Sequence, residues 1–152
     1  MNTQKIEDGL KATGQVRVVK TNAEGQVIQS FEVPNLVVTV GKNHIAAKIA
    51  ATTNSPAAMT HMAIGTGTGT PAAGDTTLGT ETGRVSLAGS VVSTNTITYT
   101  ATFPAGTGTG AITEAGIFNA GTGGTMLCRT VFPVVTKQAG DTIAVTWKVT
   151  VS

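Results

Sequence analysis

Alternation of apolar and polar residues near the C-terminus constrains the fold more than any other feature of the sequence. Over Thr142–Val151 every second side chain is apolar, which places these side chains on one face of a β-strand. The apolar positions are Ile143, Val145, Trp147, Val149 and Val151. Thr94–Phe103 repeats the pattern, with Tyr99 and Phe103 among the apolar members and threonine between them. We therefore expect strands that bury one face in a shared core and expose a threonine-rich face.

Shorter apolar runs predict further strands, most of them bounded by turns that contain glycine. These runs are Gln15–Lys20, Val27–Val33, Asn35–Val40, Met62–Ile64, Val85–Val92, Ile112–Phe118 and Thr125–Phe132. Short turns between successive strands favour antiparallel pairing. The predicted fold is mainly β: an antiparallel β-sandwich or jelly roll with one short α-helix and long loops rich in glycine and threonine.

The helix is expected over Lys42–Ala51, because apolar residues recur there with helical spacing. Its apolar stripe consists of Ile45, Ala46, Ile49 and Ala50. A chain of 152 residues suits one domain with its own core, and we assign that β-sandwich domain to residues 15–152. Residues 1–14 are polar and weakly patterned. We expect them to form an N-terminal arm that is mobile or docks on another subunit.

The longest predicted loop follows the strand that ends at Ile64. It opens with the candidate interface loop Gly65, Thr66, Gly67, Thr68, Gly69 and Thr70. Glycine permits positive φ and close backbone approach, so this run can bend sharply or lie against another segment. Further along, Asp75 is predicted to cap a short helical turn anchored by Leu78, and Glu81 to pair with Arg84 if that turn is helical. A loop of this length is usually functional or mobile.

Glu114 falls on a partly apolar face of its predicted strand, where it alternates with Ile112 and Phe118. A carboxylate in such a place is costly unless it is paired. Arg129 lies on the predicted hairpin partner, and Arg84 follows the long loop. We therefore predict a structural ion pair between Glu114 and one of these arginines, which would fix the base of the loop to the sheet. A catalytic acid is the alternative role for Glu114.

The low content of charged and aromatic residues favours protein partners over nucleic acid. Charged residues make up 12% of the chain, threonine about a fifth, and typical soluble domains carry about 25% charged residues. Such a surface suits a face that other protein covers, although a threonine-rich β protein would show it too. The net charge of +2 comes without a basic cluster, and aromatic residues are 4%, so no nucleic-acid partner is expected. We also expect no membrane partner and synthesis in the cytoplasm, since apolar runs and the N-terminus lack the required patterns.

Residues that could carry out catalysis or hold a metal or cofactor do not cluster in the sequence. The spacing of Gly65, Gly67 and Gly69 resembles a phosphate-binding loop, but no lysine and no long helix follow it. His44 and His61 have no cysteine or carboxylate at ligand spacing. The single cysteine, Cys128, can form no internal disulfide. We predict no enzyme activity, no catalytic residue, no metal site and no cofactor.

Several stretches resemble a pattern of tailed-bacteriophage virion proteins, in particular the N-terminal module of tail-collar and tail-fibre proteins. They are MAIGTGTGTPAAGDTTLGTETGRV, ITEAGIFNAGTGGTMLCRTVF and KQAGDTIAVTWKVTV, preceded by NLVVTVGKNHIAAKIA. The similarity runs from Asn35 to the C-terminus. Its most specific parts are Gly65–Gly69, Asp75, Leu78, Glu81, Arg84 and the step Glu114-Ala115-Gly116.

The resemblance implies a non-enzymatic structural protein located in the virion. It would act as a tail-fibre or collar adaptor and bind tail, portal or collar, or major capsid proteins. Fibre proteins continue into a shaft and a receptor tip, whereas the sequence ends at Ser152, so we expect a short accessory part. A capsid decoration protein is the first alternative, and a carbohydrate-binding module for host adhesion is the second. We expect a homo-oligomer such as a trimer.

Overall fold

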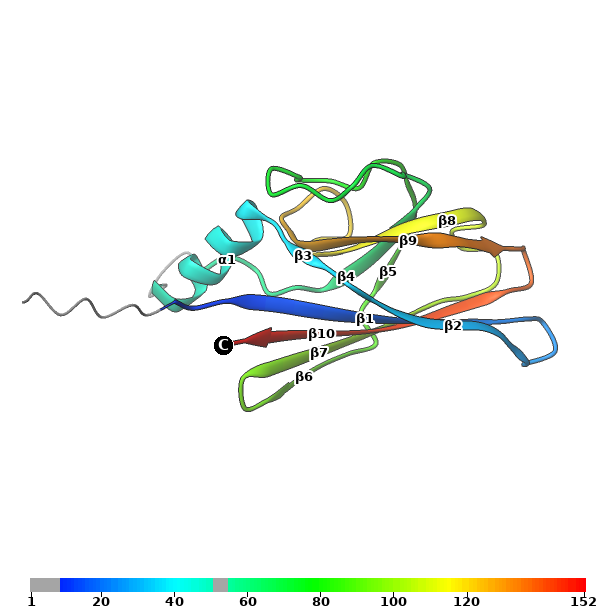
Figure 1. Cartoon of the computed structure of the whole chain (residues 1–152), viewed down its shortest axis with the longest axis horizontal. Helices are drawn as coiled ribbons and strands as arrows, with labels where there is room; N and C mark the ends of the chain where they lie inside the picture. Colours follow the sequence, from blue (N-terminus) through cyan, green and yellow to red (C-terminus); the bar gives the residue numbers. More distant parts are fainter. Residues whose placement is uncertain (1–8, 51–54) are drawn as a thin grey trace, which may run out of the picture.

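The computed structural model describes residues 9–50 and 55–152, which form two five-stranded antiparallel sheets and one helix (Figure 1). The first sheet has the order β2 (Val27–Pro34), β1 (Ala12–Thr21), β10 (Thr142–Val151), β7 (Thr96–Phe103) and β6 (Gly89–Ser93). The second has the order β3 (Leu36–Val37), β9 (Met126–Lys137), β8 (Gly110–Phe118), β4 (His61–Gly65) and β5 (Glu81–Ser86). Helix α1 spans Thr39–Ala50. The predicted mainly β, sandwich-like fold is confirmed, and jelly-roll connectivity stays a prediction.

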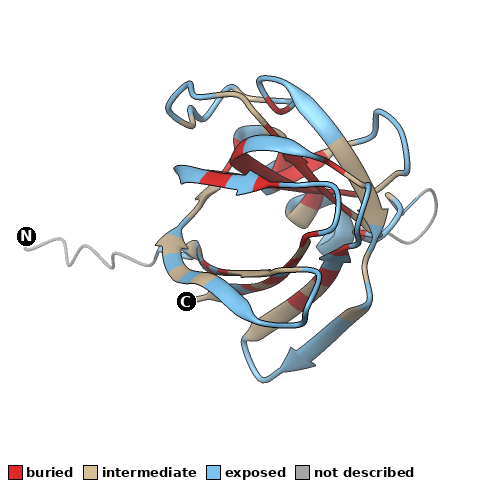
Figure 2. Ribbon diagram, turned by 90° about the vertical axis from the view of Figure 1, so that its right-hand side faces the viewer, coloured by how far each residue is buried: buried red, intermediate tan, exposed pale blue. Residues whose placement is uncertain are grey.

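The core lies between the two sheets, where the buried residues gather in Figure 2. Trp147 on the central strand β10 lies opposite Val16 of β1 and Tyr99 of β7. Its side chain is fully buried and belongs to one apolar cluster with Ile117 of the second sheet. Tyr99 and Phe103 are buried as well, so the alternation correctly predicted which aromatic residues face inward.

The segment predicted as strand Asn35–Val40 is mostly not a strand. β3 has two residues, and α1 begins at Thr39, before the expected start of the helix. Val38 donates its N–H to the carbonyl oxygen of Leu127 on β9 at 3.3 Å, and the first helical turn then lies directly on that strand. A Cβ on Gly41 would collide with the same carbonyl oxygen. The absence of a side chain at Gly41 therefore lets helix α1 lie close to the backbone of β9.

The apolar stripe predicted for the helix is mostly exposed. Ile49 is 76% exposed and Ile45 is only partly buried, whereas the buried residues of α1 are Gly41 and His44. Both buried residues lie in the first half of the helix, which contacts β9. In the later turns, Ile45, Ala46 and Ile49 line an open hollow, together with Leu10 and Val151. Burial lowers the pKa of His44, with a further contribution from nearby Lys48.

The predicted strand Val85–Val92 divides between the two sheets. β5 ends at Ser86 in the second sheet, and β6 begins at Gly89 in the first. The two residues between them form hydrogen bonds with different sheets. Leu87 N–H donates at 2.8 Å to the carbonyl of Thr60, which precedes β4 of the second sheet, and Ala88 N–H donates at 2.7 Å to the carbonyl of Thr100 on β7 of the first sheet. The chain thus crosses from one sheet to the other at this corner.

Two strands are longer than expected. β9 continues past Phe132 to Lys137, because Pro133 lies where the register with β8 shifts and extra residues are accommodated in a bulge. β1 begins at Ala12, inside the predicted arm, where Lys11 and Ser152 exchange backbone hydrogen bonds. Residues 1–8 of that arm lie outside the described residues. Over residues 9–50 and 55–152, no helix has the length and hydrophobicity needed to cross a membrane.

Candidate functional site

The long loop between β4 and β5 is held on the second sheet by the carboxylate of Glu114. This side chain projects from β8 and is fully buried. Its Oε1 accepts backbone N–H groups of Gly67 at 2.9 Å and Thr80 at 2.7 Å, and its Oε2 accepts that of Gly79 at 2.9 Å. The donors come from both ends of the loop, so a single carboxylate ties the two ends together. We call this arrangement, with Arg129, the loop lock.

Arg129 on β9 completes the loop lock. Its Nη2 and Nε donate to Glu114 Oε2 at 2.8 and 3.2 Å, and its Nη1 donates to Asp75 Oδ2 at 2.8 Å. The guanidinium side chain is 5% exposed. Of the two arginines predicted as partners of Glu114, the structure pairs it with Arg129. The contact with Asp75, which the sequence interpretation did not anticipate, joins the middle of the loop to the sheet.

Asp75 does not cap a helical turn as predicted. Its carboxylate accepts the N–H of Ala72 at 2.9 Å, and its own N–H donates to the carbonyl of Ala72 at 3.0 Å. It therefore closes a turn that precedes it, and no helix follows. Leu78 is buried with Ala63 and Phe118 in a small second apolar cluster, in agreement with its predicted role as an anchor. The loop is thus fixed by both polar and apolar contacts.

Glycines in the loop are required for close approach and not for positive φ. Neither Gly65 nor Gly67 has positive φ. A Cβ on Gly67 would lie 2.5 Å from Glu114 Oε1, and one on Gly65 would meet the same atom at 2.6 Å. Gly69 has no atom within 4 Å of its Cβ position. The glycine–threonine repeat therefore contains two residues that admit the Glu114 carboxylate and one that faces open space.

Glu81 and Arg84 form a separate ion pair at the base of the loop. Both lie on β5, which is a strand and not the helical turn that would ordinarily bring residues three apart together. A bulge makes the contact possible, because Gly65 pairs with Glu81 while Ile64 pairs with Gly83. Arg84 Nη2 lies 2.6 Å from Glu81 Oε1, and its guanidinium lies 3.9 Å from the centre of the Phe118 ring. Arg84 also donates to two carbonyl groups of the turn after β8.

Acid is expected to weaken the loop lock. Burial alone would raise the pKa of Glu114, but three backbone N–H groups and Arg129 outweigh it, so the pKa lies below its ordinary value. A lowered pKa in the folded state means that the stabilisation is complete at neutral pH and is lost as the pH falls through the folded-state pKa. Thermal unfolding from about pH 7 down to about pH 3 should therefore lose more stability in the wild type than in Glu114→Gln. Parallel pH profiles would contradict this expectation.

The chemistry open to the loop lock is structural. Both oxygens of Glu114 are occupied by N–H donors, and the buried carboxylate has no free edge toward solvent. Among the described residues, no group of three or more His, Cys, Asp or Glu could hold a metal ion. His61 lies 2.8 Å from the hydroxyl of Thr60 and 3.3 Å from that of Ser86. Burial raises the pKa of the Cys128 thiol, which keeps it protonated and unreactive.

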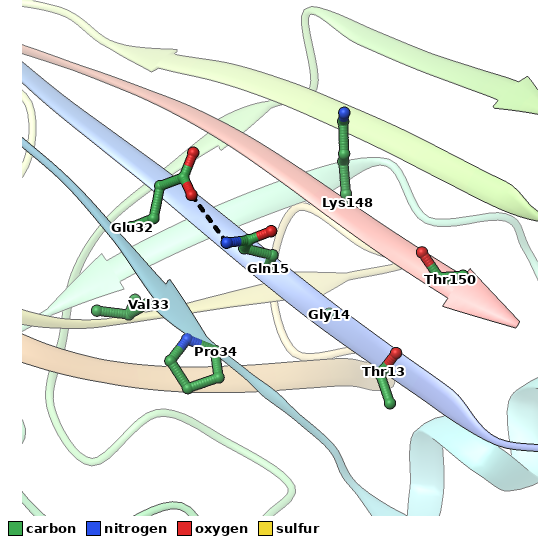
Figure 3. Close-up of a pocket in the computed structure, with 8 residues that line it drawn as sticks. All are labelled: Thr13, Gly14, Gln15, Glu32, Val33, Pro34, Lys148 and Thr150. Carbon is green, nitrogen blue, oxygen red and sulfur yellow. Dashed lines mark hydrogen bonds between the residues drawn. The ribbon is translucent and has the colours of Figure 1, made fainter. Parts of the chain in front are cut away.

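The polar side chains on the outer face of the first sheet are exposed, unlike the buried Glu114 and Arg129 of the loop lock. A shallow hollow there crosses β2, β1 and β10 (Figure 3). Gln15 Nε2 donates to Glu32 Oε2 at 2.8 Å across the hollow, and Lys148 extends away from that pair. Around them lie threonine, valine and proline side chains and the backbone of Gly14. No acid–base pair is buried in this hollow, so it offers a contact surface without reactive groups.

Comparison with known proteins adds no relative on which a function could be based. No protein-family model matches the chain. Searches of curated proteins and of solved structures found no match either.

Proposed function

We propose that the chain is a non-enzymatic structural protein of a tailed-bacteriophage virion, which acts as a tail-fibre or collar adaptor by binding neighbouring virion proteins. The virion assignment rests on the sequence resemblance over residues 35–152. The observation that supports a docking role is the loop lock, which holds a long, weakly charged loop in one conformation. Glu114 and Arg129 stand between the loop and the sheet, and both are buried. The side chains that the loop exposes beyond them include Thr68 and Thr70.

A loop that is ordered before binding favours assembly. Docking of a flexible loop would lose backbone and side-chain entropy, of about 0.5–1.5 kcal/mol for each immobilised flexible side chain. Here the loop ends are already fixed by Glu114, and the exposed side chains are small. Many weak contacts between repeated subunits can then form with little further ordering. This supports a role as a docking surface.

Capsid decoration remains the second candidate, favoured by the same bland surface. The carbohydrate-binding alternative has less support. Sugar-binding surfaces present aromatic side chains, whereas the indole of Trp147 is fully buried and Tyr99 is 6% exposed. The remaining aromatic residues are phenylalanines that are buried or partly buried: Phe31, Phe103, Phe118 and Phe132.

Quantitative mass spectrometry of purified phage particles tests the proposal. The chain should be present at a copy number close to that of tail proteins. A copy number close to that of the major capsid protein would support decoration. Absence from particles that contain all their other structural proteins would contradict both virion roles.

The docking role of the loop makes a separate prediction. Thr68→Arg should leave the free energy of unfolding within about 0.5 kcal/mol of wild type, because the side chain is exposed. It should nevertheless reduce incorporation into particles, because a long charged side chain interrupts the small-residue surface. Thr102→Arg, at an exposed position of β7, is the matched control. Equal incorporation of both variants would show that docking does not use the loop.

A further inference from the structure

The four outer edges of the two sheets are protected to different degrees. Exposed strand edges can pair with other chains, and proteins commonly block them with charged residues, proline or very short strands. In the described chain, β2 carries Glu32 and ends in Pro34, β5 carries Glu81 and Arg84, and β3 has two residues. β6 has the sequence Gly-Ser-Val-Val-Ser and contains none of these features. It is therefore the unprotected edge among the four.

β6 is also apolar on both faces. Val91 is 63% exposed and lies beside Thr98 on the outer face of the first sheet. Val92 is 69% exposed and lies beside Ile97 on the inner face. The inner position of Val92 continues an apolar row, yet the second sheet does not cover it. In Figure 1, β6 lies at the rim of the first sheet, away from the second sheet.

We propose that β6 pairs antiparallel with β6 of a second copy, about a two-fold axis at Val91. The strand has five residues, and Val91 is the middle one. Pairing about Val91 keeps the inner and outer faces of both copies aligned, and it brings no charged residues together. Ser90 then lies opposite the partner's Val92, and the two first sheets become one continuous sheet. This pairing rests on the proposed assembly function, because several copies of the chain would come together in a virion.

Charge and geometry favour this partner over β2 of a second copy. The end of β2 contains Glu32 and Pro34, and a proline cannot donate to a new ladder. Pairing of β6 with β2 would also be head-to-tail and would build open chains, whereas pairing of β6 with itself closes after two copies. Two five-residue strands bury less than the roughly 1,200 Å² of a stable specific interface. We therefore expect a weak dimer that forms as the concentration rises.

Disulfide trapping tests the proposed axis in the purified protein of 152 residues. Val91→Cys should form a covalent dimer in oxidised glutathione, because residues opposite each other in antiparallel strands are close enough for a disulfide. Val27→Cys is the matched control, since Val27 is also 63% exposed but lies on the opposite edge of the first sheet. Native Cys128 is buried and should not react. Pairing should make dimer formation by Val91→Cys roughly tenfold faster than by Val27→Cys. Equal rates would overturn the proposal.

Analytical ultracentrifugation gives an independent readout. Val91→Lys should abolish the concentration-dependent dimer, and Val27→Lys should leave it unchanged. Loss of association in both variants, open-ended assembly or a trimer would contradict the two-fold pairing. A strict monomer of the wild-type protein at high concentration would also contradict it. These experiments use the purified protein, whereas the virion role is tested on phage particles. The dimer can therefore be absent while the chain is found in virions, and the dimer can form while the chain is absent from them.

Discussion

Glu114→Gln is expected to lower the free energy of unfolding by about 3–5 kcal/mol, because it removes the buried counter-ion of Arg129 and leaves the guanidinium only the partly exposed carboxylate of Asp75. The amide keeps one oxygen for a backbone N–H donor. Its NH2 group, however, would face a donor at the position now occupied by the other oxygen. For a domain of this size, such a loss lowers Tm by about 10 °C. Chemical denaturation at neutral pH measures the effect directly.

Glu81→Gln is the matched control for Glu114→Gln. Both substitutions remove one carboxylate from an ion pair with arginine, but Glu81 is 36% exposed. Exposed pairs contribute about 0–1 kcal/mol, so this variant should remain close to wild type. If the two variants lost equal stability, burial of Glu114 would not be the source of its importance. If Glu114→Gln were as stable as wild type, the loop lock would not stabilise the fold.

Gly67→Ala should destabilise the protein by about 1–3 kcal/mol, because the new Cβ would lie 2.5 Å from Glu114 Oε1 and force the loop away from the carboxylate. Gly69→Ala is the control within the same glycine–threonine repeat. Its Cβ meets nothing within 4 Å, and its φ is not positive. Alanine at this position should be neutral or stabilise by about 0.4–1 kcal/mol, through lower entropy of the unfolded chain.

The same denaturation measurement separates the two glycine variants. The gap between Gly67→Ala and Gly69→Ala should disappear in a Glu114→Ala background, because the atom that causes the collision is then gone. A gap that persists would assign the effect of Gly67 to its backbone and not to the loop lock. Because the two sites share one sequence context, propensity alone predicts no difference between them.

Strands with one buried face could be predicted because the period of two survives in the sequence. The alternation around Trp147 and Tyr99 identified the inward-facing side chains without knowledge of their partners. The corner at Leu87 and Ala88 could not be found in this way. Gly89 follows this corner directly, but the change of sheet depends on hydrogen bonds to Thr60 and Thr100 in distant segments, which the sequence does not indicate. The helix was misjudged for a similar reason, since its packing depends on backbone contact at Gly41.

The candidate site was predictable where side-chain charge was the signal. A carboxylate on an apolar strand face requires a partner, and Arg129 on the neighbouring strand was one of two candidates. The backbone donors from Gly67, Gly79 and Thr80 have no side-chain signature, so the sequence could not indicate them. Asp75 was assigned to a following helix because aspartate commonly begins one, whereas Arg129 holds it in place.

Hydrogen exchange of three backbone amides tests the central claim most directly, which is that the long loop is a fixed part of the sandwich. In the wild-type protein at neutral pH, the amides of Gly67, Gly79 and Thr80 should exchange as slowly as those of the buried strands, because Glu114 accepts all three. In Glu114→Gln the same amides should exchange faster than the strand amides. Exchange in the wild type at the rate of an unprotected loop would contradict the account.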